Sequence, residues 1–277
     1  MKVYISIDME GVAGVATRDQ TRRGGHGYPR AQLLMTEEAN AAIAGAFQGG
    51  ASTVVVNDSH GPMDNLIHEA LDPRARVIFG SPKLECMTAG LSPANDVALF
   101  VGYHAPAGGP GVLAHTFSSH FLAVRLGGRT VSEATINALY AASLGVPVGL
   151  VTGDDVICAI AERELPGVLT VPVKTAYGWS AADSLAPSVA RDKIREGAAR
   201  AVVAAHTLHP VSVPDEMLLE VELPNATAAE LAEQIPGAKR MGSLTVAQQA
   251  TSMSDVIGFI VVCYQLAEAS VLARGER

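Results

Sequence analysis

Cysteine, aromatic side chains and charged residues are all scarce in this sequence of 277 residues. Its three cysteines, Cys86, Cys158 and Cys263, stand far apart and form no Cys-x-x-Cys pair. Neither a disulfide framework nor a metal site built from thiolates is therefore indicated. Aromatic residues make up 5% and charged residues 17%, whereas hydrophobic residues make up 48%. This composition supplies a large apolar core built mostly from small side chains.

Basic runs and long apolar segments are also missing. The formal net charge is −8, and because nucleic-acid binding normally needs a basic face, we predict no nucleic-acid partner. The longest apolar stretch, residues 256–264, is much shorter than the ~20 residues that span a bilayer, so we predict no membrane partner. The N-terminus, MKVYISIDMEG, lacks the apolar region of a secretory signal. These features predict a soluble, cytoplasmic protein.

Short apolar segments alternate with helical patterns over most of the chain. Strands are predicted at residues 3–7, 53–57, 97–102 and 148–152, and helices at residues 31–48 and 132–144. Such alternation predicts an α/β fold, with an open and mainly parallel sheet flanked by helices. A weak helix near residues 65–71 and a strand near residues 77–79 would lie between the second and third of these strands.

The pattern changes near Pro187. Beyond it we predict a helix at residues 189–205, an exposed antiparallel strand at 218–223, a helix near 227–234 and a long final helix at about 245–272. The chain is therefore divided into an α/β domain at residues 1–186 and a smaller α+β domain at residues 187–277.

Side chains that bind metals follow the ends of three predicted strands. Asp8 and Glu10 follow the first strand at an i, i+2 spacing, so both carboxylates can project the same way. His60 follows the second strand, and His104 follows the strand at residues 97–102. In an open α/β sheet, ligands bind outside the carboxyl ends of the strands. Carboxylates and imidazoles without thiolates suit a catalytic zinc or manganese site in the first domain.

Each of these residues also has a structural interpretation. Asp8 and Glu10 could form a solvated strand end, and His60 could be bonded within its own turn. His104 could be a buried core histidine. Glu133 has the strongest alternative, because Thr130-Val131-Ser132-Glu133 matches a capping box. The convergence of three strand ends favours a shared metal site for the first four residues.

Two histidines lie among small hydroxyl residues at positions 114–120. His115 or His120 could act as a general acid or base, since imidazole titrates near neutral pH, or could orient a ligand. Ser118 and Ser119 suggest a serine nucleophile, but no G-x-S-x-G motif surrounds them. Neither a G-x-G-x-x-G motif after a strand nor a Walker loop is present to indicate a nucleotide site.

Several motifs, in order along the chain, resemble the zinc-dependent D-aminopeptidase family. They are SIDMEG (residues 6–11), MTEEAN (35–40), VNDSH (56–60), GYHA (102–105) and GDD (153–155). Beyond Pro187 the resemblance is looser and rests on LTVAQQ (244–249) and the last helix.

The resemblance implies a zinc-dependent aminopeptidase that hydrolyses short peptides at their N-terminal residue, a D-residue, with water activated by two metal ions. Two zinc ions per subunit are implied, with Asp8 bridging both, Glu10 and His60 on one, and His104 and Glu133 on the other. His115 falls at the family's proposed catalytic histidine, as nucleophile, acid or base. A homo-oligomer, specifically a decameric ring, is also implied.

Two other functions would use similar ligands. A two-metal phosphoesterase needs basic residues to bind phosphate, and its candidates Arg22, Arg23 and Arg125 do not form one cluster in the sequence. A non-catalytic metal-binding assembly protein needs a closed ligand shell. The family motifs favour the peptidase over both.

Overall fold

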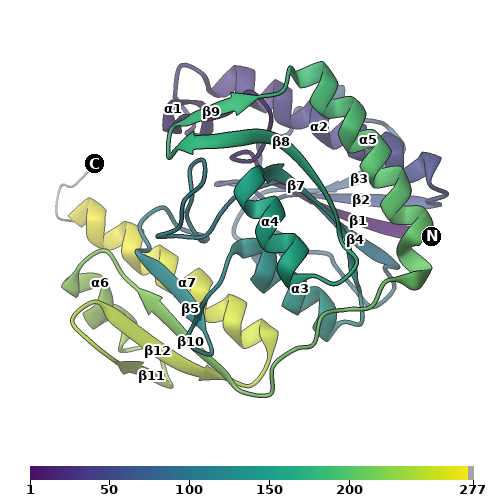
Figure 1. Ribbon diagram of the computed structural model, residues 1–277. Helices are drawn as coiled ribbons and strands as arrows, with labels where there is room; N and C mark the ends of the chain where they lie inside the picture. The colour runs from purple at the N-terminus through teal and green to yellow at the C-terminus, as the bar shows by residue number, and fades with distance from the viewer. Residues whose placement is uncertain (274–277) are drawn as a thin grey trace.

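A seven-stranded sheet forms the larger part of the computed structural model, which describes residues 1–273 (Figure 1). In sheet order, its strands are β3 (Ala75–Ile78), β2 (Thr53–Asp58), β1 (Lys2–Ile7), β4 (Val97–Tyr103), β7 (Val148–Asp154), β8 (Leu169–Gly178) and β9 (Ala181–Ser184). All neighbours pair in parallel except β8 and β9, which form an antiparallel hairpin that the sequence pattern did not predict. The predicted α/β fold with a mainly parallel sheet is confirmed.

The central strands β4 and β7 are buried along their whole length. They are apolar without alternation because helices cover both faces of the sheet. On one face, α2 (Tyr28–Gln48) packs against α5 (Pro187–Ala204). Their backbones touch at Gly45, where any side chain would collide with the carbonyl of Arg195. On the other face lie α3 (Glu133–Ser143) and α4 (Asp155–Glu164).

A second sheet of five antiparallel strands lies below the first in Figure 1. Its order is β11 (Ala238–Arg240), β12 (Thr245–Ala250), β10 (Met217–Glu222), β5 (Ala123–Leu126) and β6 (Arg129–Thr130). The helices α6 (Ala226–Ala232) and α7 (Met253–Ala273) accompany it. The predicted antiparallel strand at residues 218–223 corresponds to β10, which alternates buried and exposed side chains as expected.

Two predicted helices differ from the structure. The final helix begins at Met253, and residues 245–250 form β12, because pairing with β10 and β11 on both sides outweighs the local helical preference. The weak helix near residues 65–71 is one 3-10 turn. The remaining short elements are α1 (Arg18–Thr21) and the 3-10 turns His68–Ala70, Cys86–Thr88 and Ala205–Thr207.

Residue 187 does not separate the elements of one sheet from those of the other. β5 and β6 precede that position and pair in the five-stranded sheet, whereas α5 follows it and packs on the large sheet. The division into residues 1–186 and 187–277 stays a prediction, and the elements cross it in both directions.

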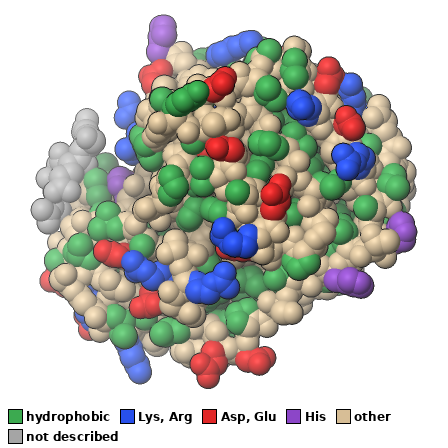
Figure 2. Space-filling view, viewed as in Figure 1, with side chains coloured by type: hydrophobic (Ala, Val, Ile, Leu, Met, Phe, Trp, Pro, Cys, Tyr) green, Lys and Arg blue, Asp and Glu red, His purple; other side chains and the backbone are tan. Residues whose placement is uncertain are grey.

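Within residues 1–273, one helix, α7, is long and apolar enough to cross a membrane by length and composition. Its buried side chains, including Val256, Ile260 and Cys263, belong to the core shared with β10 and β12. Packing in this core accounts for the buried apolar side chains of α7, whereas Val262 and Leu272 are exposed. Figure 2 shows that the charged side chains on the face in view are dispersed among apolar and neutral ones.

Candidate active site

The ends of β1 and β4 lie side by side at a topological switch point of the large sheet. From β1 the chain continues to β2 and β3 on one side, and later to β4 on the other. The two strand ends touch, because the Gly11 N–H donates to the Gly102 carbonyl at 2.7 Å. A side chain on either glycine would collide with the backbone of the other strand end. Switch points of this kind are the usual ligand sites of open α/β sheets.

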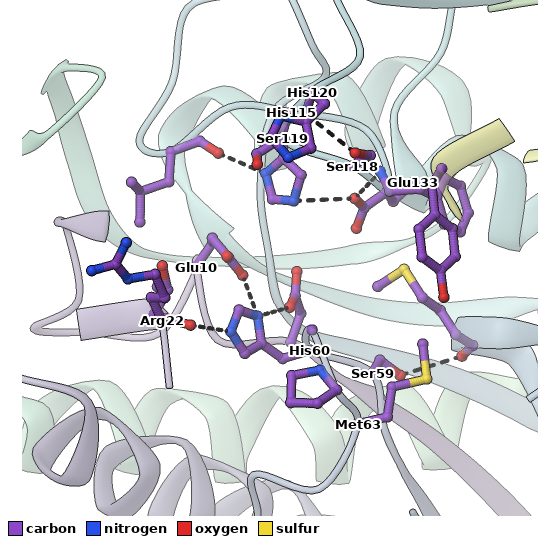
Figure 3. Close-up of a pocket in the computed structure, with 18 of the residues that line it drawn as sticks. Glu10, Arg22, Ser59, His60, Met63, His115, Ser118, Ser119, His120 and Glu133 are labelled. Carbon is purple, nitrogen blue, oxygen red and sulfur yellow. Dashed lines mark hydrogen bonds and ion pairs between the residues drawn. The ribbon is translucent and has the colours of Figure 1, made fainter. Parts of the chain in front are cut away.

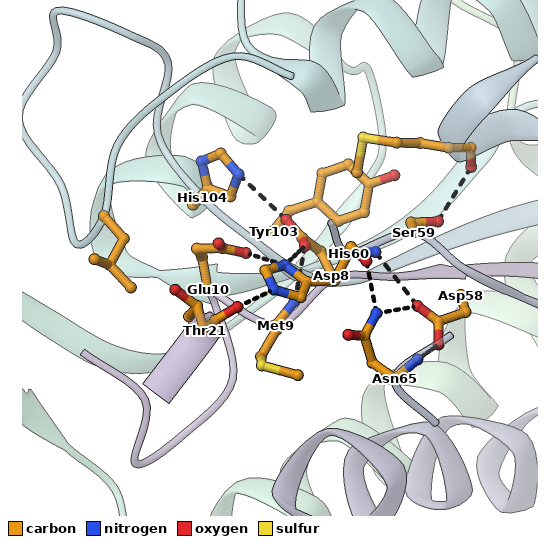
Figure 4. A network of polar contacts seen from close by, with 12 residues as sticks. Asp8, Met9, Glu10, Thr21, Asp58, Ser59, His60, Asn65, Tyr103 and His104 are labelled. Atoms are coloured by element: carbon orange, nitrogen blue, oxygen red, sulfur yellow. Dashed lines mark hydrogen bonds and ion pairs between the residues drawn. The ribbon is translucent and has the colours of Figure 1, made fainter. Parts of the chain in front are cut away.

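His60 faces two carboxylates at this edge (Figure 4). Its Nε2–H donates to the carbonyl of Thr21 at 2.7 Å, which leaves Nδ1 as the atom directed at the acids. Nδ1 lies 3.2 Å from Asp8 Oδ1 and 2.9 Å from Glu10 Oε2. The ring of His60 is therefore bonded to distant segments, whereas its backbone carbonyl accepts the Met63 N–H within its own turn at 2.7 Å.

His104 also faces two carboxylates, those of Asp8 and Glu133. Its Nδ1–H donates to the Ala105 carbonyl at 3.0 Å. Its Nε2 lies 3.2 Å from Asp8 Oδ2 and 3.3 Å from Glu133 Oε2, and it is buried without a hydrogen-bond partner. Asp8 thus presents one carboxylate oxygen to each histidine.

The spacing of these atoms fits a bound cation. Two ligands held at zinc–ligand distances of 2.0–2.1 Å in a tetrahedron are about 3.3 Å apart. The four nitrogen–oxygen separations, 2.9–3.3 Å, are close to that value. The atoms facing one another are mainly electron-pair donors, which repel unless a proton or a metal ion lies between them.

The pKa shifts within the cluster also favour a bound cation. Burial alone would lower the pKa of His60 and His104, but the charges of Glu10, Glu133 and Asp8 outweigh it and raise both values well above the ordinary one. Burial alone would raise the pKa of Asp8, but its close contacts with the imidazoles of His104 and His60 lower it. The cluster therefore holds positive charge strongly, and its mixed carboxylate and imidazole donors suit zinc.

Glu133 reaches this cluster from the start of α3. The hydroxyl of Ser132 caps the helix by accepting the Thr135 N–H at 3.0 Å, so Glu133 is the first helical residue. The capping-box interpretation of Glu133 is therefore wrong, because it places the cap two residues too early. Instead, the Glu133 carboxylate faces His104 and also accepts the N–H of Phe117.

His115 lies over the ring of His104. Figure 3 shows His115 in the cavity, near Glu133. The two rings stack with centroids 4.1 Å apart and an angle of 10° between their planes. The His115 Nδ1–H donates to the Leu113 carbonyl, and Nε2 lies 3.7 Å from Glu133 Oε1. Two groups of three residues have the spacing to hold a metal ion: His104, His115 and Glu133, and Asp8, Glu10 and His104.

The segment around His115 is held in an unusual backbone conformation. Leu113 and Phe117 both have positive φ angles, 53° and 58°. Such angles are unfavourable for large side chains and persist only where surrounding contacts enforce them. One contact comes from Trp179, in the turn after β8, which accepts the Leu113 N–H and donates its indole N–H to the Ala114 carbonyl.

The GDD motif has a structural role. Asp154 Oδ1 caps α4 through the Ile157 N–H, and its other oxygen accepts the Val112 N–H at 2.7 Å. Asp155 is exposed and accepts the Ala176 N–H. Asp154 thus supports the segment that carries His115.

Lys174 is a buried residue of the site that the sequence pattern did not reveal. From β8, its ammonium donates to three backbone carbonyls of residues 10–15, the loop that carries Glu10. Glu38 of α2 accepts the Ala13 N–H of the same loop. Burial lowers the pKa of Lys174 to about 8 and raises the pKa of Glu38 to about 7. Both residues hold the loop from behind the cluster.

We expect replacement of Lys174 by methionine to lower the free energy of unfolding by about 3–5 kcal/mol, since buried carbonyls and an acid would lose their cation. Urea denaturation of chelator-treated protein measures this without a contribution from metal. The control is Lys193→Met on the exposed side of α5, which we expect to change stability by about 0.5 kcal/mol or less. Equal stability of both variants would show that Lys174 does not hold the loop.

A cavity of about 560 Å³ opens over the cluster. Its volume suits a small ligand. Asp8, Glu10, His60, Glu133 and His115 line it, and Arg18, Arg22 and Arg23 lie at its edge. His120 also lines the cavity, and burial, aided by the charge of Arg18, lowers its pKa. Arg125 lies elsewhere, in the five-stranded sheet, where it pairs with Glu222.

Residues 1–262 match the model of a peptidase family described as D-aminopeptidase. The chain belongs to this family. It is 38% identical over 268 residues to a D-aminopeptidase of Bacillus subtilis, covering 96% of this chain and 98% of that protein. The predicted hydrolase class is confirmed by this membership.

A solved structure of the D-aminopeptidase family has the same fold. It is the Zn-dependent D-aminopeptidase DppA from Bacillus subtilis, described as a self-compartmentalizing protease. The two structures agree with a TM-score of 0.93 at 38% identity, covering 97% of this chain and 98% of that one. The family resemblance inferred from the motifs is therefore confirmed.

Proposed function

We propose that this chain is a zinc-dependent aminopeptidase that removes the N-terminal D-residue of short peptides and binds two zinc ions per subunit. The observation that carries the proposal is the placement of Asp8, which directs one oxygen at His60 and the other at His104. Membership of the D-aminopeptidase family and the zinc dependence of the related solved enzyme support the choice of metal and reaction.

In this proposal Asp8 would supply a ligand oxygen to each of the two ions. Glu10 and His60 complete one ligand set, and His104 and Glu133 complete the other. Zinc supplies a Lewis acid for the scissile carbonyl and makes water a stronger nucleophile at neutral pH. The carbonyls of Thr21 and Ala105 fix which nitrogen each imidazole presents.

His115 moves a proton at Nε2 in this proposal. Its Nδ1–H is held by the Leu113 carbonyl, so Nε2 is the atom that can exchange a proton with a ligand in the cavity. Proton transfer to the departing amine is the step that peptide hydrolysis requires of such a group. The stacking on His104 fixes the direction of the ring.

We also propose that the chain forms a homo-oligomer, arranged as a decameric ring. The related solved enzyme is described as self-compartmentalizing. A cytoplasmic location is part of the same proposal.

Removal of metal tests the reaction class. We expect a chelator to abolish release of the N-terminal residue from D-alanyl dipeptides, and added zinc to restore it, because the ligand cluster has no other source of Lewis acidity. The matched L-alanyl dipeptides should be cleaved at least about tenfold more slowly if pocket shape distinguishes the two hands, a difference of ~1.4 kcal/mol.

The same samples are assayed against a phosphate monoester. Phosphatase activity without peptidase activity would favour the phosphoesterase hypothesis. Zinc binding without either activity would favour the assembly protein. Peptidase activity that survives complete metal removal would contradict the proposal.

A further inference from the structure

Three arginines lie together at the edge of the cavity on one short segment. Arg18 begins α1, and Arg22 and Arg23 follow its last residue, Thr21. The carbonyl of Thr21 accepts the His60 Nε2–H at 2.7 Å. This bond fixes the segment against the ligand cluster, so Arg22 is one residue away from a direct contact with His60. Figure 3 draws Arg22 among the residues that line the cavity together with Glu10 and His60.

The three guanidinium groups differ in their partners. Arg23 is paired with Asp64 at 2.5 Å. Arg18 donates to the hydroxyl of Ser119 at 3.1 Å, a neutral partner on the segment that carries His115. Across residues 1–273, the Arg22 guanidinium has neither a hydrogen bond nor an ion pair. The lining of the cavity therefore offers one cation, Arg22, without an ion pair of its own. Its charge acts on Asp19, but both oxygens of that carboxylate already accept the backbone N–H groups of His26 and Gly27. A second cation, Arg18, has only a neutral partner.

The acids that line the cavity do not supply an anion for Arg22. Asp8, Glu10 and Glu133 face the two histidines, and the remaining lining acid, Glu268, comes from α7 and makes no described contact with Arg22. A guanidinium binds a carboxylate through two parallel hydrogen bonds, which makes arginine well suited to recognise one. An anionic group of the ligand is the natural partner of Arg22.

A short peptide brings such a group close to the cluster. When the N-terminal peptide bond of a dipeptide lies at the metal ligands, its C-terminal carboxylate is one residue further on, within about 3–7 Å of the scissile carbonyl. Each additional residue moves that carboxylate outward by up to ~3.5 Å. A cation in the lining of the cavity that holds the ligand cluster would therefore favour the shortest peptides.

We propose that Arg22, assisted by Arg18, binds the C-terminal carboxylate of the substrate and makes the enzyme selective for dipeptides and similarly short peptides with a free C-terminus. The inference rests on the proposed aminopeptidase function and adds to it a second recognition point, at the opposite end of the substrate from the cleaved residue.

The test compares D-alanyl-glycine with D-alanyl-glycinamide, which lacks the carboxylate charge. For the wild-type holoenzyme, we expect kcat/KM to be about 10- to 100-fold higher for the free acid, as typical for a charge-assisted bidentate contact. In Arg22→Gln, kcat/KM for the acid should fall by about the same factor, mainly through KM, while the value for the amide stays unchanged. Arg22→Lys should recover part of the loss, because it keeps the charge without the fork.

Arg30→Gln is the matched control, since this exposed arginine of α2 does not line the cavity. It should leave both substrates unaffected. Raising the salt concentration should increase KM for the acid alone in the wild type. Equal cleavage of acid and amide by the wild type, or equal losses on both in Arg22→Gln, would overturn the inference. Absence of cleavage of either substrate by the zinc-loaded wild type would instead refute the proposed function.

Discussion

Replacement of Asp8 by alanine is expected to remove both zinc ions and to lower kcat/KM by about 1000-fold or more. The carboxylate directs Oδ1 at His60 and Oδ2 at His104, so its loss takes a ligand from each set. Loss of metal removes several kcal/mol of transition-state stabilisation, and each 1.36 kcal/mol is a factor of about ten in rate. Zinc per chain, measured by elemental mass spectrometry after dialysis, and kcat/KM are determined on the same sample.

Glu10→Ala is the matched comparison, because the ion pair of Glu10 is with His60 and the proposal assigns Glu10 to one ligand set. It should leave one zinc ion per chain in place of two. Thermal unfolding of the metal-free proteins shows whether either variant fails to fold. A folded Asp8→Ala protein that keeps two zinc ions would contradict the bridging role, and a folded Glu10→Ala protein that loses both ions would show that the two sets do not bind independently.

Replacement of His115 by alanine should have the second largest effect on activity. Unlike Asp8→Ala, it should leave the zinc content unchanged. We expect kcat to fall by about 100- to 10,000-fold, the usual contribution of general acid–base catalysis. Zinc content should stay at the wild-type value, because His115 stacks on His104 and is not one of the five proposed ligands. Steady-state rates and zinc content are measured together.

His120→Ala is the control for His115. His120 lies five residues along the same segment and lines the same cavity, but its ring makes no described contact with the ligand cluster. It should change kcat by less than about tenfold, well below the acid–base range. Full activity of His115→Ala would remove that residue from the mechanism. Loss of zinc in His115→Ala would make it a metal ligand, through the group that it forms with His104 and Glu133.

Four members of the candidate cluster could be predicted from the sequence because they follow strands. Asp8, Glu10, His60 and His104 come directly after β1, β2 and β4, and parallel pairing brings these strand ends to one edge. Glu133 was different. Its local pattern matched a helix cap, and only the family resemblance placed it near the metal, because the true helix start depends on Ser132.

The rest of the site depends on contacts between distant parts of the chain. Lys174 lies 164 residues from Glu10, whose loop it supports, and no local spacing connects the two. The strand β12 was predicted as helix because its own composition does not reveal the pairing with β10 and β11 that fixes its conformation. Likewise, α5 follows the predicted domain boundary but packs on the large sheet, because its partner helix α2 lies far before it in the sequence.

The strand β8 lies near the edge of the large sheet and nevertheless supports the active site. It is next to last in the large sheet, in a hairpin of the kind where sequence changes are ordinarily best tolerated. Yet Lys174, on the strand, contacts the loop of Glu10, and Trp179, just beyond its end, contacts the segment of His115. A graft, insertion or truncation in this hairpin would disturb the metal ligands and the proton-transferring histidine together. For protein engineering, the hairpin should be treated as part of the catalytic centre and left intact when the surface is redesigned.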